Sequence, residues 1–186
     1  MEHLQVGKRF PLLKQVLLSP ALHTNPLRVK ESLVKEILRA GKEGIPLACL
    51  YGDCFPDICE VCEHYSVLKA SGCHCYEMLL GRDRFREILD ETAGTYFLEK
   101  ELLSDFERLC IEPLELHDRE MREFFFNHYR RVIYVRQPSD PDLHAKAKGI
   151  ARFLDLSLEI RDADYSHLEG ELLRLIGGRS SARWRG

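Results

Sequence analysis

The chain has 186 residues, of which 45% are hydrophobic and 31% charged, and its formal net charge is −3. This size and composition are typical of one soluble globular domain and exclude a largely disordered chain. With 27 basic and 30 acidic residues, no broad basic face is expected, which excludes nucleic acid as the main partner. No apolar run approaches the roughly 20 residues that a membrane-spanning helix needs. The charged residues 1–10 also lack the apolar core of a signal peptide, so we expect a cytoplasmic protein.

In chain order, the first clear element is a helix. Thr24-Asn25-Pro26 combines a capping side chain with a proline at the first helical position. Val29, Leu33 and Ile37 then recur at helical spacing, which predicts a helix as far as residue 40.

Strands and helices alternate along the rest of the chain. Short apolar runs bounded by turn residues predict strands over 45–51, 66–70, 96–98, 131–136 and 156–160. Helical spacing predicts a helix opened by Pro56 and further helices over 76–81, 82–90, 100–110, 114–129, 141–154 and 166–176. This alternation predicts a single α/β domain over residues 1–176, with a parallel, Rossmann-like open sheet flanked by helices. The basic residues 177–186 are predicted to form a disordered tail.

Cysteine is concentrated in one part of the chain. Six of the seven cysteines fall between Cys49 and Cys75, and only Cys110 lies outside that stretch. Because cytosolic proteins seldom use structural disulfides, such a cluster indicates metal binding, redox chemistry or an iron–sulfur cluster. Residues 49–77 are therefore the candidate site.

Two predicted strand ends carry this cluster. Ligands of open α/β sheets bind beyond the carboxyl ends of the strands. There, Gly52-Asp53-Cys54 follows the first strand and Cys73-His74-Cys75 follows the second. The candidate metal ligands are Cys54, Cys59, Cys62, Cys73, His74 and Cys75.

Thiolate ligands suit an iron–sulfur cluster or zinc, and the spacing of Cys54, Cys59 and Cys62 coincides with that of plant-type ferredoxins. The alternative is that cysteine serves as a small core residue. We assign Cys49 and Cys110 to the core on this ground, and one of Cys59 and Cys62 can join them.

A second hypothesis is a metal-free thiol enzyme. Cys54 precedes a helix, whose dipole would lower the pKa of the thiol and favour a nucleophile. His74 would then be the base, and Asp53 or Glu77 would orient it. For both carboxylates the alternative role is capping. A third hypothesis is a non-catalytic interaction module with buried cysteines, which uses its acidic surface or the aromatic residues 124–129.

Several short motifs, taken together, resemble the family called domain of unknown function 1638, over residues 19–176. These motifs, in order, are Pro20–Pro26, Tyr51–Cys54, His74–Glu77, Gly94–Leu98 and Tyr134–Gln137. The residues that match the family's pattern are His23, Tyr51, Gly52, Asp53, Cys54, His74, Cys75, Tyr76 and Glu77. Of these, His23, Tyr51, Gly52 and Tyr76 are expected to line the cofactor site. Cys59 and Cys62 lie outside the pattern, and residues 1–18 do not match the strand with which family members open.

The resemblance implies a cytoplasmic α/β domain with no established reaction, found largely in anaerobes and archaea beside corrinoid-dependent methyltransferase systems. Corrinoid or methyltransferase proteins are thus the expected partners. Asp164-x-x-His167-x-x-Gly170 is a near match to the box that supplies a histidine to cobalt, but its Asp is one residue early and His167 follows a helix cap. We assign the segment to the start of a helix and retain a cobamide as the alternative cofactor. The leading prediction is a metal- or iron–sulfur-binding accessory protein that serves methyl transfer or redox metabolism.

Overall fold

The computed structural model describes residues 13–19, 22 and 25–177. His23, much of the surrounding Pro20–Pro26 motif and the basic residues 178–186 lie outside the described residues, so the predictions for them stay predictions. Within the described residues, no helix is both long and apolar enough to cross a membrane.

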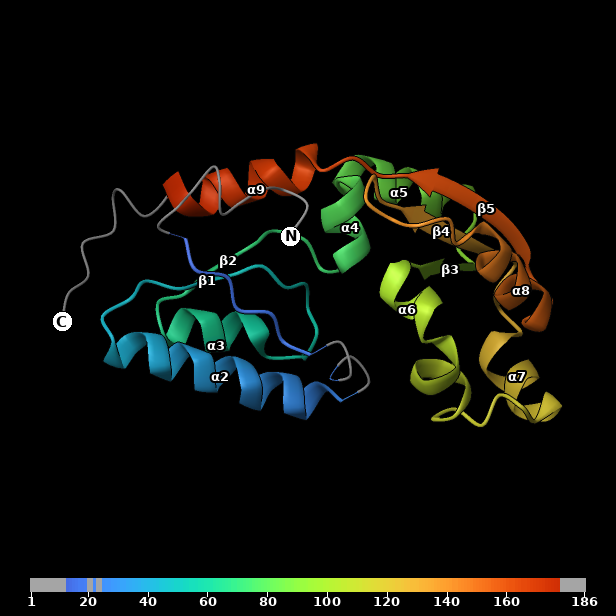
Figure 1. Cartoon of the computed structure of the whole chain (residues 1–186), viewed down its shortest axis with the longest axis horizontal. Helices are drawn as coiled ribbons and strands as arrows, with labels where there is room; N and C mark the ends of the chain where they lie inside the picture. Colours follow the sequence, from blue (N-terminus) through green and yellow to red (C-terminus); the bar gives the residue numbers. More distant parts are fainter. Residues whose placement is uncertain (1–12, 20–21, 23–24, 178–186) are drawn as a thin grey trace. The chain divides into compact units, whose positions relative to one another are not determined.

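The chain divides into two compact units, each with its own parallel sheet (Figure 1). Unit 1 combines the described residues up to Met78 with those from Tyr165 onward, and unit 2 spans Leu79–Asp164. Parallel strands flanked by helices confirm the predicted α/β class.

Unit 1 is built on two short parallel strands, β1 (Ala48–Cys49) and β2 (Leu68–Lys69), in which Ala48 pairs with Leu68. Its helices are α2 (Pro26–Lys42), α3 (Ile58–His64), the start of α4 (Cys75–Leu80) and α9 (Ser166–Gly177). Both strands are shorter than predicted at each end: residues 45–47 and 50–51 lie outside β1, and residues 66–67 and 70 lie outside β2.

Helix α2 begins as its sequence predicts. The Asn25 side chain accepts a hydrogen bond from the Arg28 backbone amide at 3.1 Å, and Pro26 occupies the first position. The spaced residues Val29, Leu33 and Ile37 are all buried.

The two sides of β1 and β2 are covered by different helices (Figure 1). Helices α2 and α3 share a core with Cys49 and Val67. On the other side, Leu175 of α9 packs with Ala70 and Met78. The C-terminal helix thus completes the unit in which the N-terminal half of the chain folds.

Unit 2 contains a three-stranded parallel sheet in the order β3–β4–β5: β3 (Thr95–Leu98), β4 (Arg131–Arg136) and β5 (Ser157–Asp162). Its helices are α5 (Arg82–Glu91), α6 (Lys100–Ser104), a π-helical turn (Glu107–Ile111), α7 (Arg119–Phe126) and α8 (His144–Phe153). The central strand is buried from Arg131 to Val135. The Arg131 side chain is satisfied there by Glu159, Glu91, Thr95 and the Ile88 carbonyl.

Two predicted helices of unit 2 are shorter than expected. The helix predicted over 100–110 is interrupted at Asp105, which leaves helical geometry at φ −130°, and continues as the π-helical turn. The helix predicted over 114–129 begins only at Arg119. Residues 114–117 form turns instead of a helix. Glu115 adopts φ +52°, and the Leu116 amide donates to the Ile111 carbonyl at 2.9 Å. The Leu116 side chain is fully buried in this conformation.

Candidate functional site

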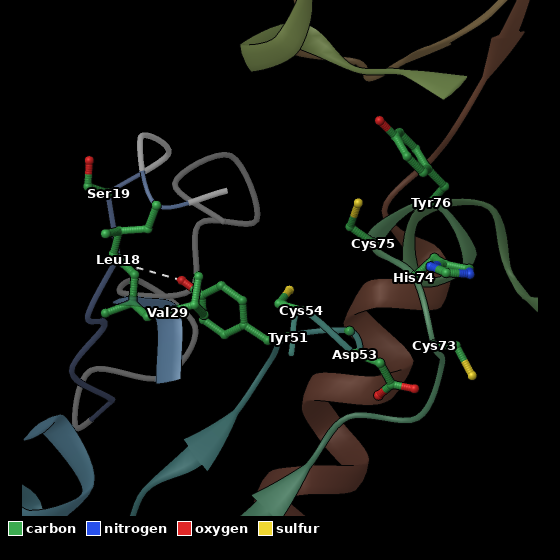
Figure 2. Close-up of a pocket in the computed structure, with 12 residues that line it drawn as sticks. Leu18, Ser19, Val29, Tyr51, Asp53, Cys54, Cys73, His74, Cys75 and Tyr76 are labelled. Carbon is green, nitrogen blue, oxygen red and sulfur yellow. Dashed lines mark hydrogen bonds between the residues drawn. The ribbon is translucent and has the colours of Figure 1, made fainter. Parts of the chain in front are cut away.

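The turns that leave β1 and β2 meet at a pocket of about 250 Å³ (Figure 2). Because the strands are parallel neighbours, their carboxyl ends lie at the same edge. The pocket is lined by Leu18, Ser19, Leu22, Val29, Tyr51, Gly52, Asp53, Cys54, Cys73, His74, Cys75 and Tyr76. The structure thus brings together two motifs that are about 20 residues apart in the sequence.

Gly52 permits the two turns to approach each other. A Cβ at this position would lie 2.8 Å from the Cys73 carbonyl oxygen and 3.1 Å from the Cα of His74. The next residue links the two turns by a hydrogen bond, since the Asp53 amide donates to the Cys73 carbonyl at 2.7 Å. The family glycine therefore lines the pocket through its backbone, and its role is to leave space.

Asp53 is engaged by Lys69, the last residue of β2. The Lys69 ammonium lies 3.0 Å from Asp53 Oδ1, and its side chain is only 12% exposed. It also donates to the carbonyls of Ala70 and Gly72 at 3.3 and 3.4 Å. Burial lowers the pKa of Lys69, but the hydrogen bond and charge of Asp53 outweigh it and raise that pKa overall. Lys69 therefore carries a full positive charge against the carboxylate.

The exposed thiol of Cys73 is also hydrogen-bonded to Asp53, whose carboxylate raises the pKa of Cys73. Sequence reasoning missed Lys69 altogether. The available signal was a single cation at the end of an apolar strand (Ser66–Ala70), beside the turn that bears the cysteines.

Cys54 and Cys75 are the two half-buried thiols of the pocket, and one comes from each turn. Burial raises the pKa of Cys54, the charge of Lys69 opposes this rise and Asp53 adds to it. The expectation of a lowered pKa is therefore wrong. Helix α3 begins four residues after Cys54, at Ile58, so its dipole does not act directly on the thiol.

His74 and Glu77 are placed differently from the predicted base and its orienting group. In Figure 2 the side chains of His74 and Cys73 point away from Cys54. Glu77 Oε2 accepts a hydrogen bond from the Cys73 amide at 2.8 Å, so this carboxylate caps the turn before α4. The capping alternative is thus the role observed for Glu77.

Cys59 and Cys62 do not line the pocket. Cys62 is 2% exposed and its thiol is hydrogen-bonded to the core thiol of Cys49, whereas Cys59 is exposed on α3. Cys110 is buried in unit 2, in agreement with its assignment to the core. Across the described residues, no three His, Cys, Asp or Glu side chains are grouped as a metal site would require.

The remaining wall of the pocket is aromatic and aliphatic. The Tyr51 hydroxyl accepts a hydrogen bond from the Leu18 amide at 3.3 Å, and burial raises the pKa of this phenol (Figure 2). Leu18, Ser19, Leu22 and Val29 were not predicted to line the site; only Val29 carried a signal, as a buried helix position.

These features define a class: a parallel α/β protein with a thiol-bearing pocket at adjacent strand ends. The chain belongs to the family described as protein of unknown function (DUF1638), whose model matches residues 17–172. This confirms the resemblance drawn from the motifs. No curated protein and no solved structure matches the chain.

Proposed function

We propose that the pocket binds a soft metal ion through the thiolates of Cys54 and Cys75, and that the protein is a cytoplasmic accessory to metal-dependent methyl transfer or redox metabolism. One observation carries this proposal: two half-buried thiols, from two different strand ends, line the same pocket. Thiolates are the protein ligands that soft ions such as Cu(I) and zinc prefer.

The residues present fit some metal groups better than others. Cys59 and Cys62 do not line the pocket, so a cluster held by the ferredoxin-like spacing of Cys54, Cys59 and Cys62 gains no support. An ion held by two thiolates keeps other ligands of its own, such as water or a small molecule. The pocket of about 250 Å³ leaves room for them, since a cavity needs only about 10–15 Å³ of such volume to hold one water. A cobamide is far larger and would have to bind across the mouth of the pocket.

The test is metal binding by matched cysteine variants. Untagged protein purified without oxygen would be assayed for metal content and titrated with Cd²⁺, followed by thiolate-to-metal charge-transfer absorbance. We expect about one equivalent to bind wild type, and Cys54→Ser and Cys75→Ser to bind at least about tenfold more weakly. Cys59→Ser is the control, because it removes an exposed thiol outside the pocket. Equal binding by all four proteins would refute the proposal.

A second candidate is thiol chemistry with Cys54 as the nucleophile. It is favoured by the position of this thiol in the pocket and by the positive charge of Lys69, which offsets part of the rise in the Cys54 pKa that burial causes. Less favourable is the direction of the His74 ring, away from Cys54 (Figure 2). Metal-free protein that shows one fast-alkylating thiol, mapped to Cys54, would support this candidate over metal binding.

A further inference from the structure

We infer that Glu171 and Arg174 of α9 are positioning residues for the pocket: together they hold the turn that presents Cys75. We call this pair the α9 clamp. The inference rests on the proposed function in taking Cys75 as a ligand. It concerns residues that lie about 100 positions from the cysteine cluster and do not line the pocket.

The α9 clamp makes hydrogen bonds to the main chain of the turn on both sides of Ala70. Glu171 Oε2 accepts a hydrogen bond from the Ser71 amide at 2.9 Å. Arg174 donates to the Lys69 carbonyl at 3.1 Å and to Glu171 Oε2 at 2.9 Å. One ion pair thus satisfies a donor and an acceptor that flank Ala70, at the exit from β2.

The path of the turn depends on two glycines, Gly72 and Gly52. Gly72 adopts φ +106°, a conformation that side chains disfavour, and the chain must then pass close to Gly52. Lys69 and Glu77 brace the turn from within its own segment. The α9 clamp braces it from a separate helix, and so ties the turn to the core of unit 1.

The ion pair is not needed to attach α9 to the rest of unit 1. The apolar contacts of α9 are made by Leu168, Leu172 and Leu175, which already attach the helix to unit 1. Glu171 is 9% exposed, and a carboxylate this buried is costly unless its bonds are specific. Both of its partners, Ser71 and Arg174, contribute to fixing the turn.

Release of the clamp should therefore loosen Cys75 more than other thiols. Cys75 packs against the cluster of Ala70, Met78 and Leu175, which limits reagent access. In the metal-free protein we expect Glu171→Gln and Arg174→Met to speed alkylation of Cys75 by about threefold or more through local opening. Alkylation of Cys59, on α3, should not change.

The metal site should weaken as well. We expect the affinity for Cd²⁺ to fall about tenfold in both variants, as is typical when a residue that orients a ligand is lost. Arg174→Lys retains a cation able to reach the same carbonyl and should restore most of the affinity. A merely structural role would not produce this selective change at Cys75.

The matched control is the ion pair of Glu36 and Arg39 on α2. It has the same spacing, is in the same unit and is not bonded to the turn. Glu36→Gln and Arg39→Met should change neither Cys75 alkylation nor Cd²⁺ affinity. Similar effects from both pairs would overturn the inference, as would clamp variants that fold and match wild type.

The two proposals fail separately. If wild type binds no Cd²⁺, the proposed function fails, and the clamp is judged on Cys75 alkylation alone. If wild type binds Cd²⁺ but the clamp variants bind equally well and alkylate at the wild-type rate, only the clamp fails. Should the variants not fold, amide exchange at Ser71 in wild type decides: protection supports the clamp, and exchange at the rate of an open chain overturns it.

Discussion

At the scale of single residues, Gly52 is the position at which the pocket depends most on the absence of a side chain. A Cβ there would lie 2.8 Å from the Cys73 carbonyl oxygen, and its three nearest neighbours are all backbone atoms, which cannot rotate aside. We therefore expect Gly52→Ala to destabilise unit 1 by about 1–3 kcal/mol and to separate the two turns. Urea-dependent hydrogen exchange at the α2 amides would measure this loss.

The control for this prediction is Gly170→Ala, in α9 of the same unit. A Cβ at Gly170 meets no atom within 4 Å. Because alanine is the better helix former, this change should stabilise by about 0.5–1 kcal/mol. If both variants shifted stability in the same direction, the close approach at Gly52 would not be the cause.

The contribution of the Glu171 carboxylate to stability should depend on pH. Burial would raise its pKa, but the ion pair with Arg174 and the bond from Ser71 lower that pKa to about 2. Since the unfolded value is about 4.3, the carboxylate stabilises the folded state fully at higher pH and loses this effect as pH falls toward 2.

Comparison with Glu171→Gln isolates this contribution. We expect the difference in free energy of unfolding between wild type and the variant to shrink steadily from about pH 5 to about pH 2. Urea unfolding at several pH values would measure it. A difference that stays constant over this range would contradict the assignment.

Much of the pocket could be predicted residue by residue, because strand ends and cysteine spacing are local signals. The residues Tyr51–Cys54 and His74–Tyr76 line it as the motifs indicated. The partners of these residues could not be predicted. Lys69 belongs to an apolar strand in sequence, and Glu171 reaches the turn only because the chain returns after unit 2.

At the scale of elements, α7 carries one phenylalanine that is buried in the core and another that is exposed on the surface. Phe126 is 7% exposed and contacts the ring of Tyr96 edge to face at 5.1 Å, whereas Phe124 is 72% exposed. We expect Phe126→Ala to destabilise unit 2 by about 3–5 kcal/mol and Phe124→Ala by about 0.5 kcal/mol or less. Hydrogen exchange at the β4 amides would measure both. Similar losses in the two variants would mean that α7 packs through its other face.

The elements that the sequence predicts best are those with uninterrupted burial. Strand β4 has the bounds predicted from its apolar run, 131–136. Helical spacing proved less reliable around residues 100–118. There a π-helical turn and the left-handed Glu115 bury Leu116 outside any α-helix, a result of tertiary packing that spacing does not encode.

At the scale of the whole molecule, the two units differ in how the chain builds them. Unit 2 is one continuous segment, Leu79–Asp164, with its own three-stranded sheet and a core that includes Leu98, Val132 and Tyr134. Unit 1 needs both ends of the described chain, because Leu172 and Leu175 of α9 cover β1 and β2.

This difference predicts the behaviour of fragments. Residues 79–164 expressed alone should fold cooperatively, since every strand and the main apolar cluster of unit 2 remain present. Residues 1–78 alone should not form the pocket, because they lack both the apolar face of α9 and the α9 clamp. Amide dispersion in two-dimensional NMR spectra would distinguish folded from unfolded fragments. Addition of a peptide spanning residues 165–177 should restore order to the 1–78 fragment; if that fragment folded without the peptide, α9 would not be required to complete unit 1.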